Sequence, residues 1–386
     1  MRYRADYAWL GGDTVTAGVL IEVEGERITR VSQGDGGDVR LRGVTLPGLA
    51  NAHSHAFQRA LRGRTQRGGG SFWTWRVDMY ALADTMTPDR CFELATGTYA
   101  EMLKAGITTV GEFDYLHFSD ALIAAANETG IRLTLLDACY LAGGFGVELN
   151  DAQRRFSDGD AARWAERVEQ IHGAKVGAAI HSVRAVPADQ IPTVVEFAQG
   201  RPLHFHLSEQ RAENEACLDA HGCTPTELLA QHGALGPDST AVHATHLTEN
   251  DERLLHETTI CMCPTTERDL ADGIGTAGPG LSLGSDSHAV IDLFEEARAV
   301  ELNLRLATEE RGHFTAAELL RGATNHASLG WPDAGRIEPG ALADLVTVGL
   351  DSPRLETAEA DTMLESIVFA ATAADVTGVI VGGKPC

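Results

Sequence analysis

Two histidines one residue apart follow an apolar run near the N-terminus. The run Val44–Ala50 has the character of a buried strand, and His53 and His55 come just after it. Because side chains alternate between the two faces of a strand, both imidazoles should point the same way. Two neutral imidazoles on one side of a strand end can bind a single divalent cation, most often zinc. Taken alone, the pair fits two ordinary polar residues at the edge of a core equally well.

Further imidazoles and a carboxylate follow three later apolar runs. His206 lies in the run 202–207, His243 lies in the run 240–244, and Asp286 and His288 follow the run 281–284. Chance readily places one histidine at a strand end, but not histidines at four. Three histidines and one aspartate would suit zinc or ferrous iron and leave a position open for water.

The rest of the chain alternates strand-length apolar runs with amphipathic helical segments. The candidate strands are Val44–Ala50, Ile107–Phe113, Ile131–Tyr140, Val176–His181, Pro202–Leu207, Thr240–Ala244, Thr259–Cys263 and Leu281–Gly284. Helical segments lie between most of them, such as Pro88–Ala105, Asp120–Thr129, Asp160–Ile171 and Pro225–His232. Repeated strand–helix units predict a parallel sheet, and eight of them predict a closed (β/α)8 barrel of the α/β class. The polar groups above would then meet at the carboxyl ends of the strands.

Both ends of the chain have β character of a different kind. Val19–Val23 and Arg27–Val31 form a predicted hairpin, and Leu342–Val348 and Gly378–Gly383 are predicted strands. We therefore expect residues 1–46 and 336–386 to form a small flanking β-sandwich domain. Residues 47–335 would form the metal-dependent catalytic barrel.

Composition narrows the classes of partner. The formal net charge of −24 opposes binding to nucleic acid or to an anionic membrane. No apolar run approaches the roughly 20 residues of a membrane span, and no signal-peptide core follows Met1. The seven cysteines are scattered and odd in number, as expected for buried thiols in a reducing compartment. A cytoplasmic location is expected.

The whole pattern resembles the amidohydrolase superfamily, whose members are metal-dependent barrels, many with a flanking β-sandwich. The match runs from 46–48 (Leu-Pro-Gly) to 335–345. The resemblance implies four metal ligands, His53, His55, His206 and Asp286, and three catalytic groups, Glu209, His243 and Asp286. Many two-metal members bridge their ions with a modified lysine at the end of the fourth strand. Here Lys175 lies before the start of that strand, so one divalent ion, zinc by expectation, is predicted.

Within that superfamily, four segments resemble the N-formimino-L-glutamate iminohydrolases: 72–76, 112–115, 181–184 and 284–288. The resemblance implies hydrolytic deimination of N-formimino-L-glutamate to N-formyl-L-glutamate and ammonia, in histidine degradation, by a homodimer. It implies five substrate-binding residues, Gln58, Arg76, Tyr115, His181 and Arg184. The two arginines fit this substrate, because a guanidinium binds a carboxylate bidentately and formiminoglutamate carries two carboxylates.

Two other functions remain open. A different aminohydrolase on the same scaffold could act on a purine, pyrimidine or triazine, although Arg76 and Arg184 favour a dicarboxylate. A non-catalytic barrel would be expected to have lost metal ligands, and none is lost here. His204 is expected to pack or hydrogen-bond, and His246 and His288 to support the site. The other histidines are expected at surface or capping positions: His117, His172, His221, His232, His256, His313 and His326.

Overall fold

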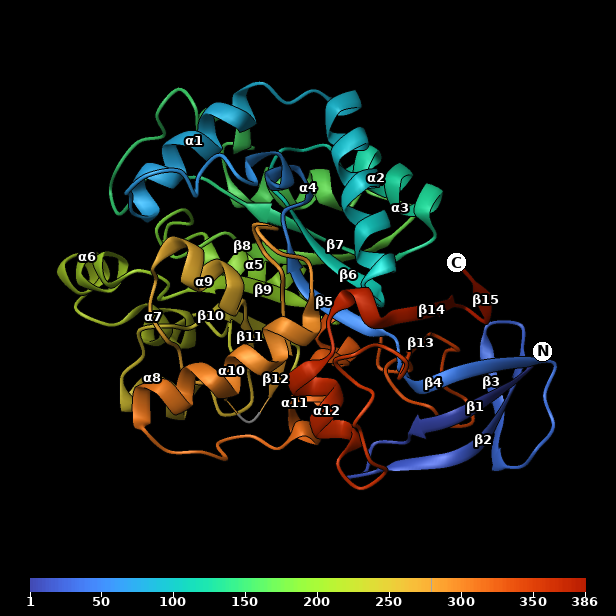
Figure 1. Cartoon of the computed structure of the whole chain (residues 1–386). Coiled ribbons are helices and arrows are strands. Elements are labelled where there is room, and N and C mark those ends of the chain that lie inside the picture. The colour runs from blue at the N-terminus through green and yellow to red at the C-terminus, as the bar shows by residue number, and fades with distance from the viewer. Residues whose placement is uncertain (279) are drawn as a thin grey trace.

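Eight parallel strands form a closed barrel in the computed structural model, which describes residues 1–278 and 280–386. The strands are β5 (Leu49–Ser54), β6 (Ile107–Asp114), β7 (Arg132–Cys139), β8 (Lys175–Ile180), β9 (Leu203–Leu207), β10 (Ser239–His243), β11 (Thr259–Met262) and β12 (Leu281–Leu283). Strand β12 pairs with β5 and closes the ring. The predicted (β/α)8 barrel is confirmed, and it lies beside a separate sheet that holds both chain termini (Figure 1).

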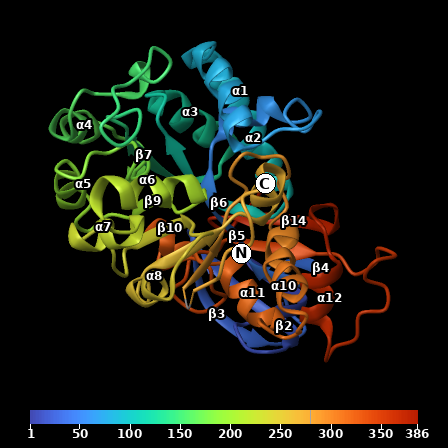
Figure 2. The same cartoon turned by 90° about the vertical axis from the view of Figure 1, so that its left-hand side faces the viewer.

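Helices lie around the barrel strands (Figure 2). They are α1 (Phe72–Asp84), α2 (Pro88–Lys104), α3 (Ser119–Thr129), α4 (Ala161–Val168), α5 (Ile191–Phe197), α6 (Arg211–His221), α7 (Pro225–Gln231), α8 (Glu249–Leu254), α9 (Pro264–Leu270), α10 (Leu293–Thr308), α11 (Ala316–Ala323) and α12 (Met363–Ala370). Several begin where the sequence supplies a cap; Thr224, for example, accepts from the Glu227 backbone, with Pro225 as the first helical residue. Among the described residues, no helix is both long and apolar enough to cross a membrane.

The apolar run predicted as the first barrel strand, Val44–Ala50, is divided between two sheets. Strand β4 (Val39–Pro47) ends before Gly48, and β5 begins after it. A Cβ at Gly48 would lie 2.2 Å from Oγ1 of Thr108, so the backbone can pass β6 this closely only at glycine. The prediction of one strand over Val44–Ala50 was therefore wrong. Both segments are buried, and hydrophobicity alone cannot reveal a change of sheet between them.

The chain ends build one seven-stranded sheet in the order β15-β14-β13-β4-β1-β2-β3. Besides β4 it contains β1 (Arg2–Trp9), β2 (Val15–Glu24), β3 (Arg27–Gln33), β13 (Leu345–Val348), β14 (Val376–Val381) and β15 (Lys384–Pro385). The segment before β13 returns to β3, because Ile28 N donates to Ala341 O at 2.9 Å and Ala343 N to Glu26 O at 2.8 Å. The sheet and the segment that returns to β3 enclose a separate apolar core. The predicted flanking domain, contributed by both chain ends, is confirmed.

A 3₁₀ turn, η3 (His326–Leu329), closes one end of the barrel. The Oγ1 of Thr134 donates to Leu329 O at 2.8 Å, and Nε2 of His204 lies 2.8 Å from Ser328 O. His326 is buried, with Nε2 2.7 Å from Gly48 O. Its predicted surface or capping position was wrong, whereas His204 packs and hydrogen-bonds as expected. The groups named as catalytic lie at the other end, where the strands finish.

A buried ion pair joins the barrel to the flanking sheet and gives a stability prediction. Arg132 Nε lies 2.7 Å from Oδ2 of Asp344, whose side chain is fully buried, and Nη2 lies 3.1 Å from Oδ1. Arg132→Met leaves this carboxylate without its cation, which should lower the free energy of unfolding by about 3 kcal/mol. Urea denaturation followed by circular dichroism measures the loss. The matched control is Arg2→Met, because Arg2 pairs with Asp38 in solvent; equal midpoints for the two variants would contradict the prediction.

Candidate active site

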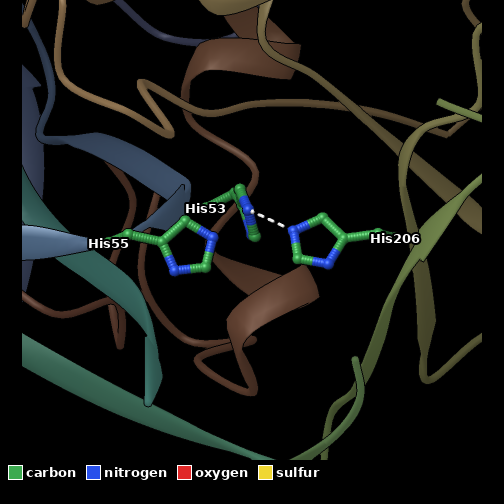
Figure 3. A group of neighbouring side chains, drawn as sticks. All are labelled: His53, His55 and His206. Carbon is green, nitrogen blue, oxygen red and sulfur yellow. Dashed lines mark hydrogen bonds between the residues drawn. The ribbon is translucent and has the colours of Figure 1, made fainter. Parts of the chain in front are cut away.

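Four side chains from three strand ends meet at the open end of the barrel. Nε2 of His53 lies 3.1 Å from Nε2 of His206 and 3.3 Å from Oδ1 of Asp286. Nε2 of His55 lies 3.5 Å from the same Asp286 oxygen. Figure 3 shows the rings of His55 and His206 on opposite sides of His53. All four side chains are buried. Their donor atoms fall in two overlapping groups, His53 with His55 and His206, and His53 with Asp286 and His243, each within 4.8 Å, so the four predicted ligands meet around His53.

Hydrogen bonds behind two of the rings decide which nitrogen faces the centre. Nδ1 of His206 lies 2.7 Å from His181 O, and Nδ1 of His55 lies 3.3 Å from Phe113 O. A carbonyl only accepts, so each Nδ1 carries the hydrogen and each Nε2 of a neutral ring presents a lone pair. Burial keeps the rings neutral: it lowers the pKa of His55 to about 3 and lowers that of His206 well below its ordinary value.

This donor set fits a divalent cation. Burial opposes ionisation of Asp286, but its hydrogen bond to His53 and its electrostatic interactions with His53, His243 and His55 together outweigh burial and hold the pKa of the carboxyl well below its usual range. The lone pair of His55 Nε2 therefore faces the Asp286 carboxylate at 3.5 Å, and Nε2 of His206 lies beside Nε2 of His53. Electron-rich acceptor atoms at this distance repel each other unless a cation lies between them. Three imidazoles with one carboxylate are suitable ligands for zinc.

Glu209 and His243 lie beside the cluster and face each other. Nδ1 of His243 is 3.4 Å from Oε1 of Glu267 on α9, which turns Nε2 toward Glu209 Oε1 at 3.7 Å and Asp286 Oδ2 at 3.9 Å. Burial raises the pKa of Glu209. Burial opposes charging of His243, but Glu209 and then Glu267 outweigh it and raise its pKa. The pair can hold and pass a proton at the edge of the cluster. Sequence reasoning gave Glu267 no role, and no local motif marks it.

Backbone strain concentrates at these strand ends. His243 has φ 68° and Asp286 has φ 40°, in the left-handed region that costs an L-residue about 1 kcal/mol. Ser208, Ala244 and His288 share this region. The surrounding hydrogen bonds hold the strained segments in place: Asp286 N donates to His53 O at 3.0 Å, and His55 N to Asp286 O at 3.2 Å.

A buried polar chain supports the ligands from behind. Ser54 Oγ donates to Glu112 Oε2 at 2.5 Å and lies 3.0 Å from Nε2 of His288. Nδ1 of His288 is 3.0 Å from Ser285 Oγ, which also accepts from Asn51. This chain links β5 and β6 to the segment after β12. His288 therefore supports the site, as expected, while Glu112 lies in a segment noted in the sequence but was assigned no role.

All five predicted substrate-binding residues line a small cavity above the cluster: Gln58, Arg76, Tyr115, His181 and Arg184. Gln58 Nε2 donates to Tyr115 Oη at 3.1 Å. Arg184 is partly buried, and its Nε lies 3.5 Å from Oε1 of buried Glu213 without forming a hydrogen bond. Helix α1 adds a wall that the sequence reasoning named only as a tryptophan-rich segment: Phe72, Trp75, Met79 and Tyr80. The substrate-binding roles stay predictions.

Removal of one inward-facing imidazole should weaken metal binding. His206→Ala deletes a lone-pair donor, and we expect its affinity for Zn²⁺ to fall at least about tenfold. Metal content after equilibration with zinc and gel filtration, measured by inductively coupled plasma mass spectrometry, reports the change. His256→Ala, at an exposed position, is the matched control and should bind zinc like the wild type. A His206→Ala protein that keeps one tightly bound zinc per chain would contradict the prediction.

Comparison with known proteins agrees with this geometry. The model of the amidohydrolase family matches residues 44–386. Formimidoylglutamate deiminase of Pseudomonas aeruginosa is 34% identical over 95% of this chain and 88% of its own length. A 5-methylthioadenosine/S-adenosylhomocysteine deaminase of Natronomonas pharaonis is 30% identical over 96% and 88%. The crystal structure of an amidohydrolase from Brucella melitensis, 34% identical, superposes with a TM-score of 0.91 over 100% of this chain and 94% of that one. This chain therefore belongs to the amidohydrolase family.

Proposed function

We propose that the protein hydrolyses N-formimino-L-glutamate to N-formyl-L-glutamate and ammonia, as a step of histidine degradation. The observation that carries the proposal is the position of Arg76 and Arg184. The guanidinium groups of both arginines line the same cavity as the imidazole–carboxylate cluster, in a protein with a formal net charge of −24. A substrate with two carboxylates and a hydrolysable amidine fits both features, and the deiminase relative supports the same substrate.

Of the two arginines, Arg184 has the surroundings that more strongly favour binding of a substrate carboxylate. Its guanidinium is partly buried beside Glu213, and neither the Arg184 Nε nor either carboxylate oxygen of Glu213 has a hydrogen-bond partner among the described residues. A shielded arginine without good hydrogen bonds gains much from a bidentate carboxylate ligand. Gln58 and Tyr115 add neutral donors on another wall of the cavity. The cavity can thus hold the carboxylates while the formimino carbon lies at the barrel mouth.

The chain's own residues supply the proton transfers. Asp286, which stays ionised, accepts a proton from the attacking water as the new C–O bond forms at the formimino carbon. Glu209 delivers its proton to the imino-derived nitrogen, and the proton held by Asp286 passes to the same nitrogen. The hydroxyl of the tetrahedral carbon returns a proton to Glu209 as the C=O bond forms, the C–N bond breaks and ammonia leaves. His243, kept charged by Glu209 and Glu267, stabilises negative charge at the tetrahedral centre. A divalent ion held by His53, His55, His206 and Asp286, which we propose to be zinc, would lower the pKa of water and so supply hydroxide near neutral pH.

A deaminase acting on a nucleoside is the alternative that a specific observation favours. The deaminase of Natronomonas pharaonis named above matches this chain at 30% identity. A purine ring would need flat apolar surfaces and amide partners, and α1 does bring Phe72 and Trp75 to the cavity. Two arginines in that cavity have no role toward a neutral purine, so we rank this alternative second.

Ammonia release by the zinc-loaded protein tests the proposal. N-formimino-L-glutamate should be turned over, whereas 5-methylthioadenosine and guanine should release no ammonia above background. Asp286→Asn should reduce kcat by at least about a thousandfold, because the proton acceptor and a ligand are lost together. Ammonia from a purine alone would replace this proposal with the nucleoside alternative. Near-full activity of Asp286→Asn would overturn the role of the carboxylate.

Arg184→Lys tests the carboxylate site separately. Lysine keeps a positive charge beside Glu213 but loses the planar fork. We expect KM for N-formimino-L-glutamate to rise about tenfold or more with a smaller change in kcat, because binding common to the ground and transition states is lost. Steady-state kinetics measures both constants. Arg201→Lys, at an outward-facing ion pair with Glu169, is the control and should not change KM. An unchanged KM in Arg184→Lys would contradict the assignment.

A further inference from the structure

A compact group of hydrogen bonds involves Arg76, Tyr80, Tyr140 and Gln153 at the wall of the cavity formed by α1. Arg76 Nε donates to Tyr80 Oη at 2.9 Å, and Tyr80 Oη lies 3.0 Å from Tyr140 Oη. Gln153 Nε2 donates to Tyr140 Oη at 2.9 Å and lies 3.3 Å from Tyr80 Oη. The members come from α1, from the end of β7 and from the residue before the 3₁₀ turn η2 (Arg154–Phe156). None of Tyr80, Tyr140 and Gln153 has a role in the mechanism above.

The direction of these hydrogen bonds is determined by their surroundings. Gln153 Oε1 accepts from Asn150 N at 3.0 Å, so the amide nitrogen must face the two tyrosines. Tyr80 Oη then accepts from Arg76 and from Gln153, which occupies both of its lone pairs. Its own hydrogen is donated to Tyr140 Oη. Burial raises the pKa of Tyr140, which remains a neutral phenol.

This group holds the Nε edge of Arg76 and leaves the other edge free. The Nη atoms of Arg76 make no hydrogen bond within residues 1–278 and 280–386, while the guanidinium carbon lies 5.1 Å from the centre of the Tyr80 ring. A guanidinium fixed at Nε and at one face can turn little. Its free edge can therefore receive a carboxylate at one defined place.

The loop after β7 also holds α1 at a second point. Arg155 Nη1 donates to Ala83 O at the end of α1, and Arg155 Nη2 lies 3.5 Å from Met86 O. At its other end α1 follows the glycines 68–70, which restrict the backbone little. The position of Arg76 therefore depends on contacts between α1 and the loop after β7. The metal ligands, in contrast, are fixed by the barrel strands.

We infer that Tyr80, Tyr140 and Gln153 are positioning residues that fix the Arg76 guanidinium and so select the length of the dicarboxylate substrate. The inference rests on the proposed function. The reacting carbon is located by barrel residues and the distal carboxylate by Arg76, so the spacing between them is set by this hydrogen-bonded group. We therefore expect a glutamyl chain to reach the free edge of Arg76 and an aspartyl chain, one methylene shorter, to fall short of it.

The test is a double-mutant cycle on the zinc-loaded full-length protein. The variants are Tyr140→Phe, Arg76→Met and the pair together, assayed with N-formimino-L-glutamate and N-formimino-L-aspartate. Affinity for N-formyl-L-glutamate is measured by calorimetry as a readout independent of turnover. Tyr140→Phe keeps the ring that packs edge-on against His181 and Phe156. Tyr7→Phe, in the flanking sheet, is the matched control.

We expect Tyr140→Phe to raise KM for the glutamate substrate at least fivefold, to weaken product binding equally, and to change kcat less than twofold. The preference for glutamate over aspartate should fall. In the Arg76→Met background the same substitution should change KM less than twofold, because it acts through Arg76. Additive effects, or a fall in kcat at unchanged KM, would overturn the inference while leaving the proposed function intact. A wild-type protein inactive on both formimino substrates would overturn both.

Discussion

The site depends on holding mutually repelling acceptor atoms together in a buried space. The lone pair of His55 faces the Asp286 carboxylate, that of His206 faces the same cluster, and all three side chains are shielded from water. His53 relieves part of the repulsion, because its Nε2 lies 3.1 Å from Nε2 of His206 and 3.3 Å from Oδ1 of Asp286, and a cation would relieve the rest. The arrangement persists because the backbone carbonyls of His181 and Phe113 fix two of the rings and because Asp286 exchanges backbone hydrogen bonds with His53 and His55.

The barrel makes those constraints possible. Its far end is closed by η3, and the flanking sheet is tied to β7 through Arg132 and Asp344. The strand ends can therefore carry left-handed residues such as His243 and Asp286 without losing their relative positions. Rigid strands hold the groups that perform chemistry, whereas α1 and the loop after β7 carry the groups that meet the substrate. This division lets members of one family share the reaction and differ in substrate.

Much of this architecture could be predicted from the sequence. Period-two patterning placed His53 and His55 on one side of a strand, and apolar runs located the seven barrel strands after the first to within one residue at each end. The break at Gly48 could not be predicted, because buried segments on either side look alike. His326 and Glu267 were missed because their partners are set by tertiary packing. Gln153 contacts Tyr80 from 73 residues away, a separation at which no local pattern exists.

The most direct measurement is a crystal structure of the zinc-loaded protein with N-formyl-L-glutamate, with anomalous data collected at the zinc edge. The account predicts one anomalous peak per chain, enclosed by His53, His55, His206 and Asp286. It also predicts one product carboxylate on Arg184 and the other on the free edge of Arg76. Two peaks, a peak elsewhere, or a product whose carboxylates avoid both arginines would contradict it.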